Sequence, residues 1–376
     1  MTELYIGLDV HKTSIAIGLA RAGECEPVFY GKCGSGFDQF RKVVSRILKK
    51  YGLEADQVKL CYEAGPTGFV IARLMRRLGF DLIVVPPSLI PSKPGERVKT
   101  DRRDALKLAR LLRAGELPEV NIPNADDEAI RDVSRARSDA VDDLRRNRFR
   151  LGAFLLRNGH NWSGKSRWGA AHMRYLRELI LSDPAQRIVL EEYLQAIDAA
   201  QLRVERLEAH LKDLLEAWDR ANWVKAIQGF RGFQLVGSMI IASELGDITR
   251  FDHPRQLMAY VGLVPGEYSS GDRRQQGGIT KCGNSHARWM LIEAAVHYRM
   301  LPKVSRELSL RQEGLSRELK AVGWRAQNRL YKRYHRLKMS GLHDNKVKVA
   351  VARELVAFLW EAAQILDQQT KRNQAA

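Results

Sequence analysis

The sequence predicts an α/β domain at the N-terminus, a long helical arm after it, and a mainly helical C-terminal domain. Three observations lead to this prediction. The first 120 residues contain apolar runs of strand length, residues 126–222 carry apolar stripes at helical spacing, and the composition changes after Trp223. A chain of 376 residues is long enough for two or three domains with their own cores. We expect the domains to span 1–120, 126–222 and 223–376.

The N-terminal elements follow a recognisable order. Two short strands joined by a tight turn fill Leu4–Arg21, and a third strand covers Pro27–Lys32. Helices and strands then alternate over Gly36–Gly52 (helix), Val58–Tyr62 (strand), Thr67–Gly79 (helix), Asp81–Pro87 (strand) and Thr100–Gly115 (helix). The order β-β-β-α-β-α-β-α is the layout of the ribonuclease-H-like fold, since a doubly wound fold needs a crossover helix after its first strand.

Acidic residues fall at positions that this layout brings together. Asp9 interrupts an otherwise apolar strand, and Glu63 ends a strand expected to lie beside it. Asp101 and Asp104 share one face at the start of a helix. Each acid alone also fits a solvated strand end or a helix start. Four converging carboxylates would repel one another unless divalent cations bound them, which predicts a catalytic Mg²⁺ site for phosphoryl transfer.

The charge of the chain indicates a polyanionic partner. The formal net charge is +18, and Lys99, Arg102 and Arg103 lie beside the two aspartates of the helix. These cations are expected to bind a phosphate backbone, although a solvated basic helix face is the alternative. A membrane surface is the weaker choice, because no apolar run approaches bilayer length and no secretion signal is visible. Four cysteines without metal-site spacing fit a reducing cytoplasm.

The middle of the chain reads as two long helices. Apolar residues recur at spacings of three, four or seven, which predicts an antiparallel coiled-coil arm or an oligomer interface. Between the helices, the loop Gly159–Gly169 places Trp162 and Trp168 on either side of Lys165 and Arg167. Those tryptophans could stack on bases or pack the tip of the arm.

Two glycine-containing segments stand out in the C-terminal part. Gly229 and Gly232 precede an apolar helix, and they fit a phosphate-binding helix-hairpin-helix or a plain helical corner. Tyr260–Arg288 combines glycines with exposed-type hydroxyls and with four cations that we expect to contact nucleic acid: Arg273, Arg274, Lys281 and Arg288. Ser270 precedes a glycine there, and it would be either a nucleophile activated from elsewhere or a phosphate-binding loop serine.

The motifs together resemble a known family. Asp9 in IGLDVHK, Glu63 in YEAGPTG, the two aspartates of KTDRRDALKLA, and then GLVPGEYSSG, GGITKCGN and Arg288 occur in this order. They are similar to the DEDD-type insertion-sequence transposases, which are bridge-RNA-guided serine recombinases related to the Piv DNA invertases. The resemblance runs from the first strand to about Met300. It implies a RuvC-like N-terminal domain, a coiled-coil arm and a C-terminal transposase domain.

The resemblance also implies a chemistry. Asp9, Glu63, Asp101 and Asp104 would be the metal ligands for Mg²⁺, with Mn²⁺ as a substitute, and Ser270 would attack DNA to form a phosphoserine link. Donor and target DNA, a non-coding bridge RNA and a homo-oligomer (dimer or tetramer) that shares active sites between subunits would be the partners. The protein would act in a bacterial or archaeal cytoplasm at the nucleoid.

Two other functions compete with this one. A RuvC-like structure-specific endonuclease would hydrolyse DNA with metal-activated water, and a non-catalytic RNA-binding protein would use neither the acids nor metal. The tail departs from the family pattern, because residues 301–376 hold sixteen Lys and Arg against seven Asp and Glu, half of the whole positive excess. We expect its helices either to contact nucleic acid or to pack on the C-terminal domain.

Overall fold

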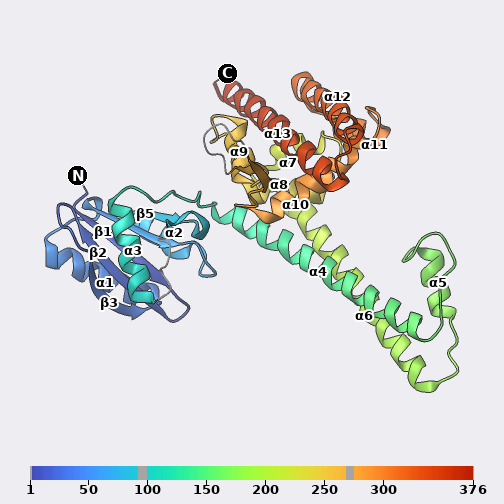
Figure 1. The fold of residues 1–376 in the computed structure, drawn as a ribbon, viewed down its shortest axis with the longest axis horizontal. Coiled ribbons are helices and arrows are strands. Elements are labelled where there is room, and N and C mark those ends of the chain that lie inside the picture. Colours follow the sequence, from blue (N-terminus) through green and yellow to red (C-terminus); the bar gives the residue numbers. More distant parts are fainter. Residues whose placement is uncertain (1, 92–99, 268–274, 376) are drawn as a thin grey trace. The chain divides into compact units, whose positions relative to one another are not determined.

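The computed structural model describes residues 2–91, 100–267 and 275–375. The chain divides into two compact units, Met1–Pro123 and Asn124–Ala376 (Figure 1). The first is a mixed α/β unit and the second is almost entirely helical. No helix in the described ranges is long and apolar enough to span a lipid bilayer.

The first unit is built on one five-stranded sheet with the order β3-β2-β1-β4-β5. Strands β1, β2 and β3 form an antiparallel meander, and β4 and β5 continue the sheet parallel to β1. The elements follow the order along the chain that the sequence predicts, and the strand that ends at Glu63 lies beside the strand of Asp9, as expected. The elements are β1 (Leu4–Val10), β2 (Ser14–Arg21), β3 (Val28–Gly34), α1 (Phe37–Tyr51), β4 (Val58–Glu63), α2 (Val70–Arg77), β5 (Asp81–Val85) and α3 (Asp101–Arg113).

The two faces of this sheet carry different helices. Alternate residues of β1, such as Leu4, Ile6 and Leu8, are fully buried in a core that includes side chains of α1 and α2. Because successive strand residues point to opposite faces, Gly7 and Asp9 face the other side of the sheet. A smaller apolar cluster on that side contains residues of β4, β5 and α3. Asp9 therefore shares a sheet face with α3.

Helix α3 lies unusually close to the sheet, and two glycines make that possible. Gly7 and Gly18 are direct partners across β1 and β2. A Cβ atom on Gly7 would lie 2.3 Å from the Ala105 carbonyl oxygen, and one on Gly18 would lie 2.6 Å from the same atom. No side chain fits at either position without moving the helix backbone. The two glycines thus set the short distance between α3 and the strands β1 and β2.

The second unit begins with a helical hairpin. Helices α4 (Ala125–Arg157) and α6 (Pro184–Glu216) run side by side, and α5 (Ala170–Glu178) lies in the connection between them (Figure 1). Each long helix has 33 residues, about 50 Å at the usual rise. The contacts Arg137–Glu208, Asp143–Arg203 and Asn147–Ala196 show that the two helices are antiparallel. Buried residues on α6 recur every seven positions, at Leu190, Ile197, Val204 and Leu211.

The tryptophans of the connecting loop pack against the arm itself. The Trp162 ring lies 5.2 Å from the His172 ring and 5.1 Å from the Tyr175 ring, and its Nε1 donates a hydrogen bond to the Ser166 carbonyl. Trp168 contacts His172 edge-on at 5.1 Å. Of the two interpretations open for this loop, packing of the tip is the one that these contacts favour.

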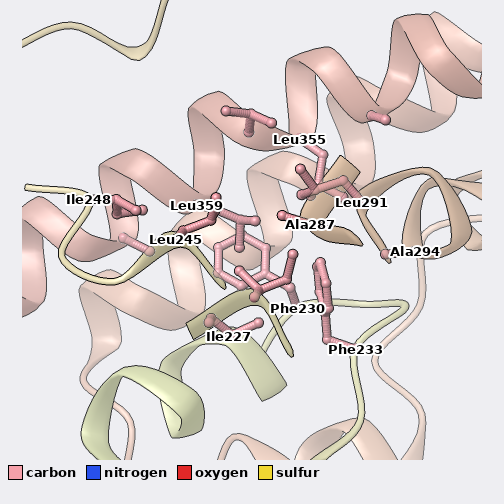
Figure 2. Close-up of a cluster of buried hydrophobic side chains, with 14 of the residues drawn as sticks. Ile227, Phe230, Phe233, Leu245, Ile248, Ala287, Leu291, Ala294, Leu355 and Leu359 are labelled. Atoms are coloured by element: carbon pink, nitrogen blue, oxygen red, sulfur yellow. The ribbon is translucent and has the colours of Figure 1, made fainter. Parts of the chain in front are cut away.

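A single apolar core holds the rest of the second unit together. Phe230 and Phe233 lie at its centre among Ile227, Leu291 and Leu355 (Figure 2). The elements around it are α7 (Ala221–Gln228), α8 (Leu235–Leu245), α9 (Pro254–Tyr260), β6 (Pro265–Glu267), β7 (Gln276–Ile279), α10 (Ser285–Ala295), α11 (Arg306–Arg311), α12 (Arg317–Met339) and α13 (Asp344–Ala375).

The basic tail is part of this core. Helices α12 and α13 form an antiparallel pair, linked by Arg325–Glu361 and Arg329–Glu354. Leu330 of α12 and Leu359 of α13 are fully buried with the residues of α7, α8 and α10. The tail helices therefore pack on the other helices of the second unit, which agrees with the expectation that they pack rather than stand apart. Several of their cations are exposed, among them Arg325, Lys332 and Arg336 of α12.

Candidate active site

The acidic group that the sequence predicts is centred on Asp9, at the end of β1. His11 Nε2 lies 3.1 Å from Asp9 Oδ2 and 3.6 Å from Asp101 Oδ1. One ligand atom from each of these three residues falls within 4.8 Å of the others. The side chains of Asp9 and Asp101 are 19% and 37% exposed, so solvent and ligands reach both carboxylates.

The start of α3 places Asp101 in this group. Thr100 adopts an extended backbone, and its hydroxyl oxygen accepts a hydrogen bond from the Arg103 amide, which caps the helix. Asp101 is the first helical residue, where the helix dipole favours an anion. Since Gly7 and Gly18 hold the helix down at Ala105, its N-terminal turn meets the end of β1.

Lys32 on β3 provides a positive charge beside the Asp101 carboxylate. Its Nζ donates a hydrogen bond of 2.6 Å to Asp101 Oδ2. This hydrogen bond is the main reason why the pKa of the Asp101 carboxyl lies below its ordinary value. Asp101 is therefore ionised at neutral pH, as a metal ligand has to be.

The other two predicted acids lie outside the tight group. Glu63 ends β4 one residue after Tyr62, which is the register partner of Leu8 on β1. It lines a hollow of about 820 Å³ together with Asp9 and His11. Asp104 is partly buried in the first turn of α3. Within the described ranges, neither residue joins the three whose ligand atoms lie within 4.8 Å.

The donor set fits a divalent cation. Carboxylate oxygens are the preferred ligands of hard cations, and imidazole widens the choice to transition metals such as Mn²⁺. Because the Lys32 ammonium already contacts Asp101, a metal ion bound here would take the place of that ammonium beside the carboxylate. The open hollow beside Asp9 and Glu63 gives a phosphate access to such an ion.

The predicted cations of the first unit are only partly placed. Lys99 lies outside the described residues. Arg102 and Arg103 are exposed on the first turn of α3, and the Arg102 guanidinium lies 5.4 Å from the centre of the Phe29 ring. Arg113, at the other end of α3, hydrogen bonds to the backbone carbonyls of Arg21 and Cys25, which is a structural role.

Three predicted site residues of the segment Tyr260–Arg288 lie outside the described residues. They are the predicted nucleophile Ser270 and the predicted nucleic-acid contacts Arg273 and Arg274. The strands β6 and β7 flank these three residues in the chain. Lys281 is exposed and has a left-handed backbone with φ of +55°. Arg288 instead donates from Nη1 to the carbonyl oxygens of Val261 and Cys282, so part of its guanidinium holds the loop together.

Two glycines allow the two ends of the segment Tyr260–Arg288 to approach each other closely. Gly262 and Gly283 both have positive φ, at +65° and +69°. A Cβ atom on Gly283 would lie 1.9 Å from the Tyr260 carbonyl oxygen, and one on Gly262 would lie 2.3 Å from that of Cys282. These glycines serve the close approach of the chain to itself. Gly232 is similar, since its Cβ would lie 2.5 Å from the Ala294 carbonyl oxygen, which favours a packed helical corner there.

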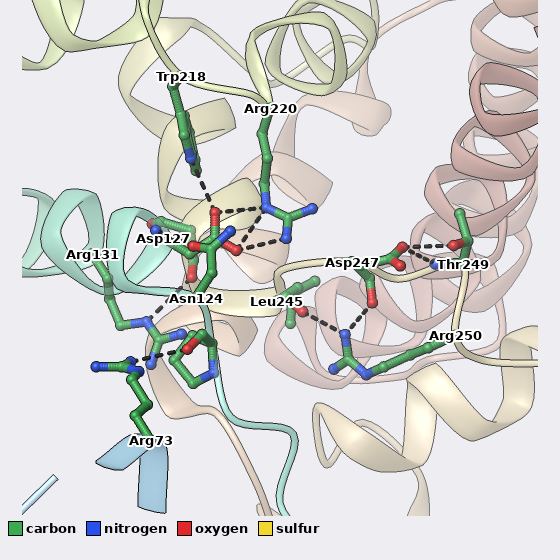
Figure 3. Close-up of polar contacts among 12 residues, drawn as sticks. Arg73, Asn124, Asp127, Arg131, Trp218, Arg220, Leu245, Asp247, Thr249 and Arg250 are labelled. Carbon is green, nitrogen blue, oxygen red and sulfur yellow. Dashed lines mark hydrogen bonds and ion pairs between the residues drawn. The ribbon is translucent and has the colours of Figure 1, made fainter. Parts of the chain in front are cut away.

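A buried carboxylate that the sequence did not predict as a site residue, Glu244, holds Asn284 near the end of the segment Tyr260–Arg288. Glu244 on α8 accepts hydrogen bonds from Arg135 Nε at 2.8 Å and Nη2 at 2.9 Å, and from Asn284 Nδ2 at 2.6 Å. Asn284 in turn caps α10 by accepting from the Ala287 amide. The lone acid in the apolar stretch LVGSMIIASEL was the signal that could have revealed it. A second such centre is Asp127, which binds Arg220 and Trp218 (Figure 3).

Sequence reasoning also missed His11, Lys32 and the Gly7–Gly18 pair. Lys32 is separated from Asp101 by 69 positions, so only the pairing of β2 with β3 brings it near. His11 stands two residues after Asp9, and that short spacing was the available signal. The glycines occupy central strand positions, where glycine is unfavourable unless another backbone comes close.

Comparison with known proteins identifies the family. Residues 6–158 match the profile of DEDD transposases of the IS110 type, and residues 224–309 match that of the transposase IS116/IS110/IS902 family. The protein y4qE of Sinorhizobium fredii, whose name describes a transposase, is 42% identical over 98% of this chain and 90% of its own length. The transposase for insertion sequence element IS1533 of Leptospira borgpetersenii is 27% identical over 89% of this chain and 96% of its own length.

These matches cover both halves of the chain and all four of the predicted acids. They agree with the mixed sheet, the accessible acidic group beside it and the excess of positive charge. The protein is therefore an enzyme that cuts and rejoins DNA, and it belongs to the IS110/IS116 family of DEDD insertion-sequence transposases.

Proposed function

We propose that this transposase joins itself to DNA through Ser270 while Asp9, Glu63, Asp101 and Asp104 hold Mg²⁺. The observation that carries the proposal is the assembly of Asp9 and Asp101 in one accessible group, in a chain that also contains the serine run GLVPGEYSSG. Two acids from distant parts of the sequence meet there because α3 packs on the glycine pair of the sheet.

In the proposed step, the Ser270 hydroxyl loses its proton and its oxygen forms a bond to a backbone phosphorus of DNA. One P–O bond to a deoxyribose breaks, and the released sugar hydroxyl takes up a proton. In the phosphoserine intermediate, the phosphorus is esterified to Ser270 and to one DNA strand. Attack on it by a second deoxyribose hydroxyl then releases the serine and rejoins the strands. Mg²⁺, or Mn²⁺ in its place, would supply positive charge for the phosphate oxygens when bound.

The finer architecture belongs to the same proposal. The strand order β3-β2-β1-β4-β5 supports a RuvC-like domain over 1–120. The seven-residue spacing on α6 supports a coiled-coil arm over 126–222, followed by a transposase domain over 223–376. We further propose a dimer or tetramer that shares active sites, a bridge RNA that selects donor and target DNA, and action at the nucleoid. Sequencing of RNA that co-purifies with the protein tests the RNA partner.

The covalent link gives the decisive experiment. The protein is incubated with labelled element-end DNA and Mg²⁺, and adducts are separated on a denaturing gel. We expect the Ser270→Ala variant to form no adduct while it still binds DNA. The neighbouring serine provides a matched control, so Ser269→Ala should form the adduct as the unchanged protein does.

Two results would contradict the proposal. An adduct that persists in Ser270→Ala, or that is lost only in Ser269→Ala, assigns the nucleophile elsewhere. Free cleaved ends without any adduct in the unchanged protein would instead indicate a RuvC-like endonuclease that uses water.

A further inference from the structure

A large groove in the second unit has no role in the chemistry described so far. It is about 1170 Å³ in volume and lies between α9, the β6–β7 pair, α12 and α13. Small-molecule pockets usually measure roughly 300–1,000 Å³, so this groove has room for a segment of polymer. We refer to it as the basic groove.

The rim of the groove is strongly positive. Six of its lining residues are cations and one is an acid: Arg255, Lys281, Arg329, Arg333, Lys346 and Arg353, with Glu354. Glu354 pairs with two of the cations, Arg329 and Arg333, at 3.0 Å each. In the part of the chain that the structure describes, the other four form no ion pair. Groups of unpaired cations around one hollow attract a polyanion.

The floor of the groove is apolar. It is lined by Met258 and Leu263 from the α9 region and by Val349, Ala357 and Phe358 of α13. Phe358 is only partly buried, so some of its ring is accessible. A groove lined both by cations and by an accessible aromatic ring suits a nucleic-acid strand, because its phosphates can contact the cations while a base stacks on the ring. In a duplex, the faces of the bases are already stacked inside the helix.

We propose that the basic groove binds a single-stranded nucleic-acid segment. The tail helices supply one wall, with Arg329 and Arg333 on α12 and Lys346 and Arg353 on α13. The other wall contains Lys281, which lies within the glycine-containing segment Tyr260–Arg288. The strand in the groove is a single-stranded DNA or RNA segment, and the phosphate and base chemistry is shared by both. This inference does not depend on Ser270 acting as a nucleophile.

Binding measured without catalysis tests the proposal. Fluorescence anisotropy of labelled single strands is recorded at several salt concentrations, in chelator so that no cleavage occurs. For the double variant Lys346→Gln/Arg353→Gln, we expect affinity to fall roughly tenfold. The slope of log affinity against log salt should become shallower by about 1.4, since each phosphate contact on a single strand contributes about 0.7. Thermal unfolding checks that the variant is folded.

A matched control lies on the same helix pair. Lys332 and Arg336 are exposed on α12 and do not line the groove. Lys332→Gln/Arg336→Gln removes the same charge, and it should leave both affinity and salt slope close to those of the unchanged protein. If the control pair weakens binding as much as the groove pair, attraction by overall charge explains the effect and the proposal fails.

A third variant tests the floor. Phe358→Leu keeps an apolar side chain but removes the ring, and it should weaken single-strand binding about fivefold with an unchanged salt slope. Comparison of RNA with DNA of the same sequence then identifies the natural strand, and tighter binding of either one supports the proposal. Duplex DNA that binds as tightly as single strands, with the same sensitivity to the groove variants, would overturn it.

Because no strand is cut in these measurements, their failure says nothing against the serine chemistry. Likewise, loss of the covalent adduct in Ser270→Ala leaves the groove untested. The two proposals can therefore fail independently.

Discussion

The two units each contain a carboxylate centre that contacts basic side chains, and the two centres are built differently. In the first unit, Asp9 and Asp101 are accessible, and their partners are an exposed imidazole and a lysine. In the second unit, the Glu244 side chain is 0% exposed and receives three hydrogen bonds from Arg135 and Asn284. Solvent therefore reaches the carboxylates of the first centre, whereas the Glu244 carboxylate is closed to solvent.

This difference separates a ligand site from a structural one. A buried carboxylate is stable only when guanidinium and amide groups satisfy its oxygens, and those groups leave no position for a metal ion. An accessible pair of carboxylates with one flexible ammonium can give up that contact at little cost. The contrast predicts opposite responses to substitution, which we give in order of the expected change in the free energy of unfolding.

The largest loss of stability should come from substitution in the glycine pair Gly7 and Gly18, which lies against the backbone of α3. In Gly7→Ala, the new Cβ would overlap the backbone of α3 at 2.3 Å, so the helix has to move away from the strands. We expect unit 1 to lose about 3 kcal/mol of stability, the upper part of the usual range for overpacking. The loss can be measured from hydrogen exchange of the β1 amides. DNA cleavage should fall as well, because Asp101 would move away from Asp9.

Gly65→Ala is the control for this substitution in the same unit. Gly65 has an unstrained backbone, and its added Cβ would find its nearest neighbour at 3.8 Å. Stability should therefore change by less than about 0.5 kcal/mol. Equal losses in the two variants would show that the close approach of α3 has no special importance.

The second effect concerns Glu244. Glu244→Gln leaves Arg135 without its anion, and we expect a loss of about 3 kcal/mol, the lower end for a broken buried pair, because Arg135 is half exposed. Burial alone would raise the pKa of Glu244, but the hydrogen bonds from Arg135 and Asn284 and the charges of Arg135 and Arg131 lower it overall. Its stabilising contribution is thus complete above the ordinary value of 4.5 and is lost as pH falls through the lowered pKa.

Chemical denaturation at several pH values checks this sign. The gap in stability between the unchanged protein and Glu244→Gln should be widest near neutral pH and should narrow as the solution is acidified below about 4.5. A gap that stays constant down to strongly acidic pH would mean that Glu244 is not the titrating group.

The smallest change in stability should come from the candidate metal site at Asp9, His11 and Asp101. Asp101→Asn removes an accessible, solvent-screened ion pair with Lys32, so the free energy of unfolding should stay close to that of the unchanged protein. The variant should lose divalent-metal binding, which a Mn²⁺ titration measures, and it should also lose DNA cleavage. A strongly destabilised Asp101→Asn that still binds metal would reverse the assignment of the two centres.

Much of the first unit could be predicted from local patterns. The strand runs and the capping residue Thr100 specify their elements through side-chain periodicity and hydrogen bonding close in sequence. The position of Asp9 in an apolar strand likewise pointed to a site. Arg288 shows the limit of such reasoning, because its type suits a phosphate but its Nη1 is held by two carbonyls of its own loop.

The sequence by itself determined which residues form strands and helices, where the acids stand on them, and that the chain carries a large positive excess, because these depend on neighbours in the chain. Only the tertiary structure decided that Lys32 and His11 join Asp101, that Gly7 and Gly18 form one seat for α3, and that the tail cations face a groove beside Lys281. Each of these pairs residues far apart in sequence, and packing of whole elements brings them together.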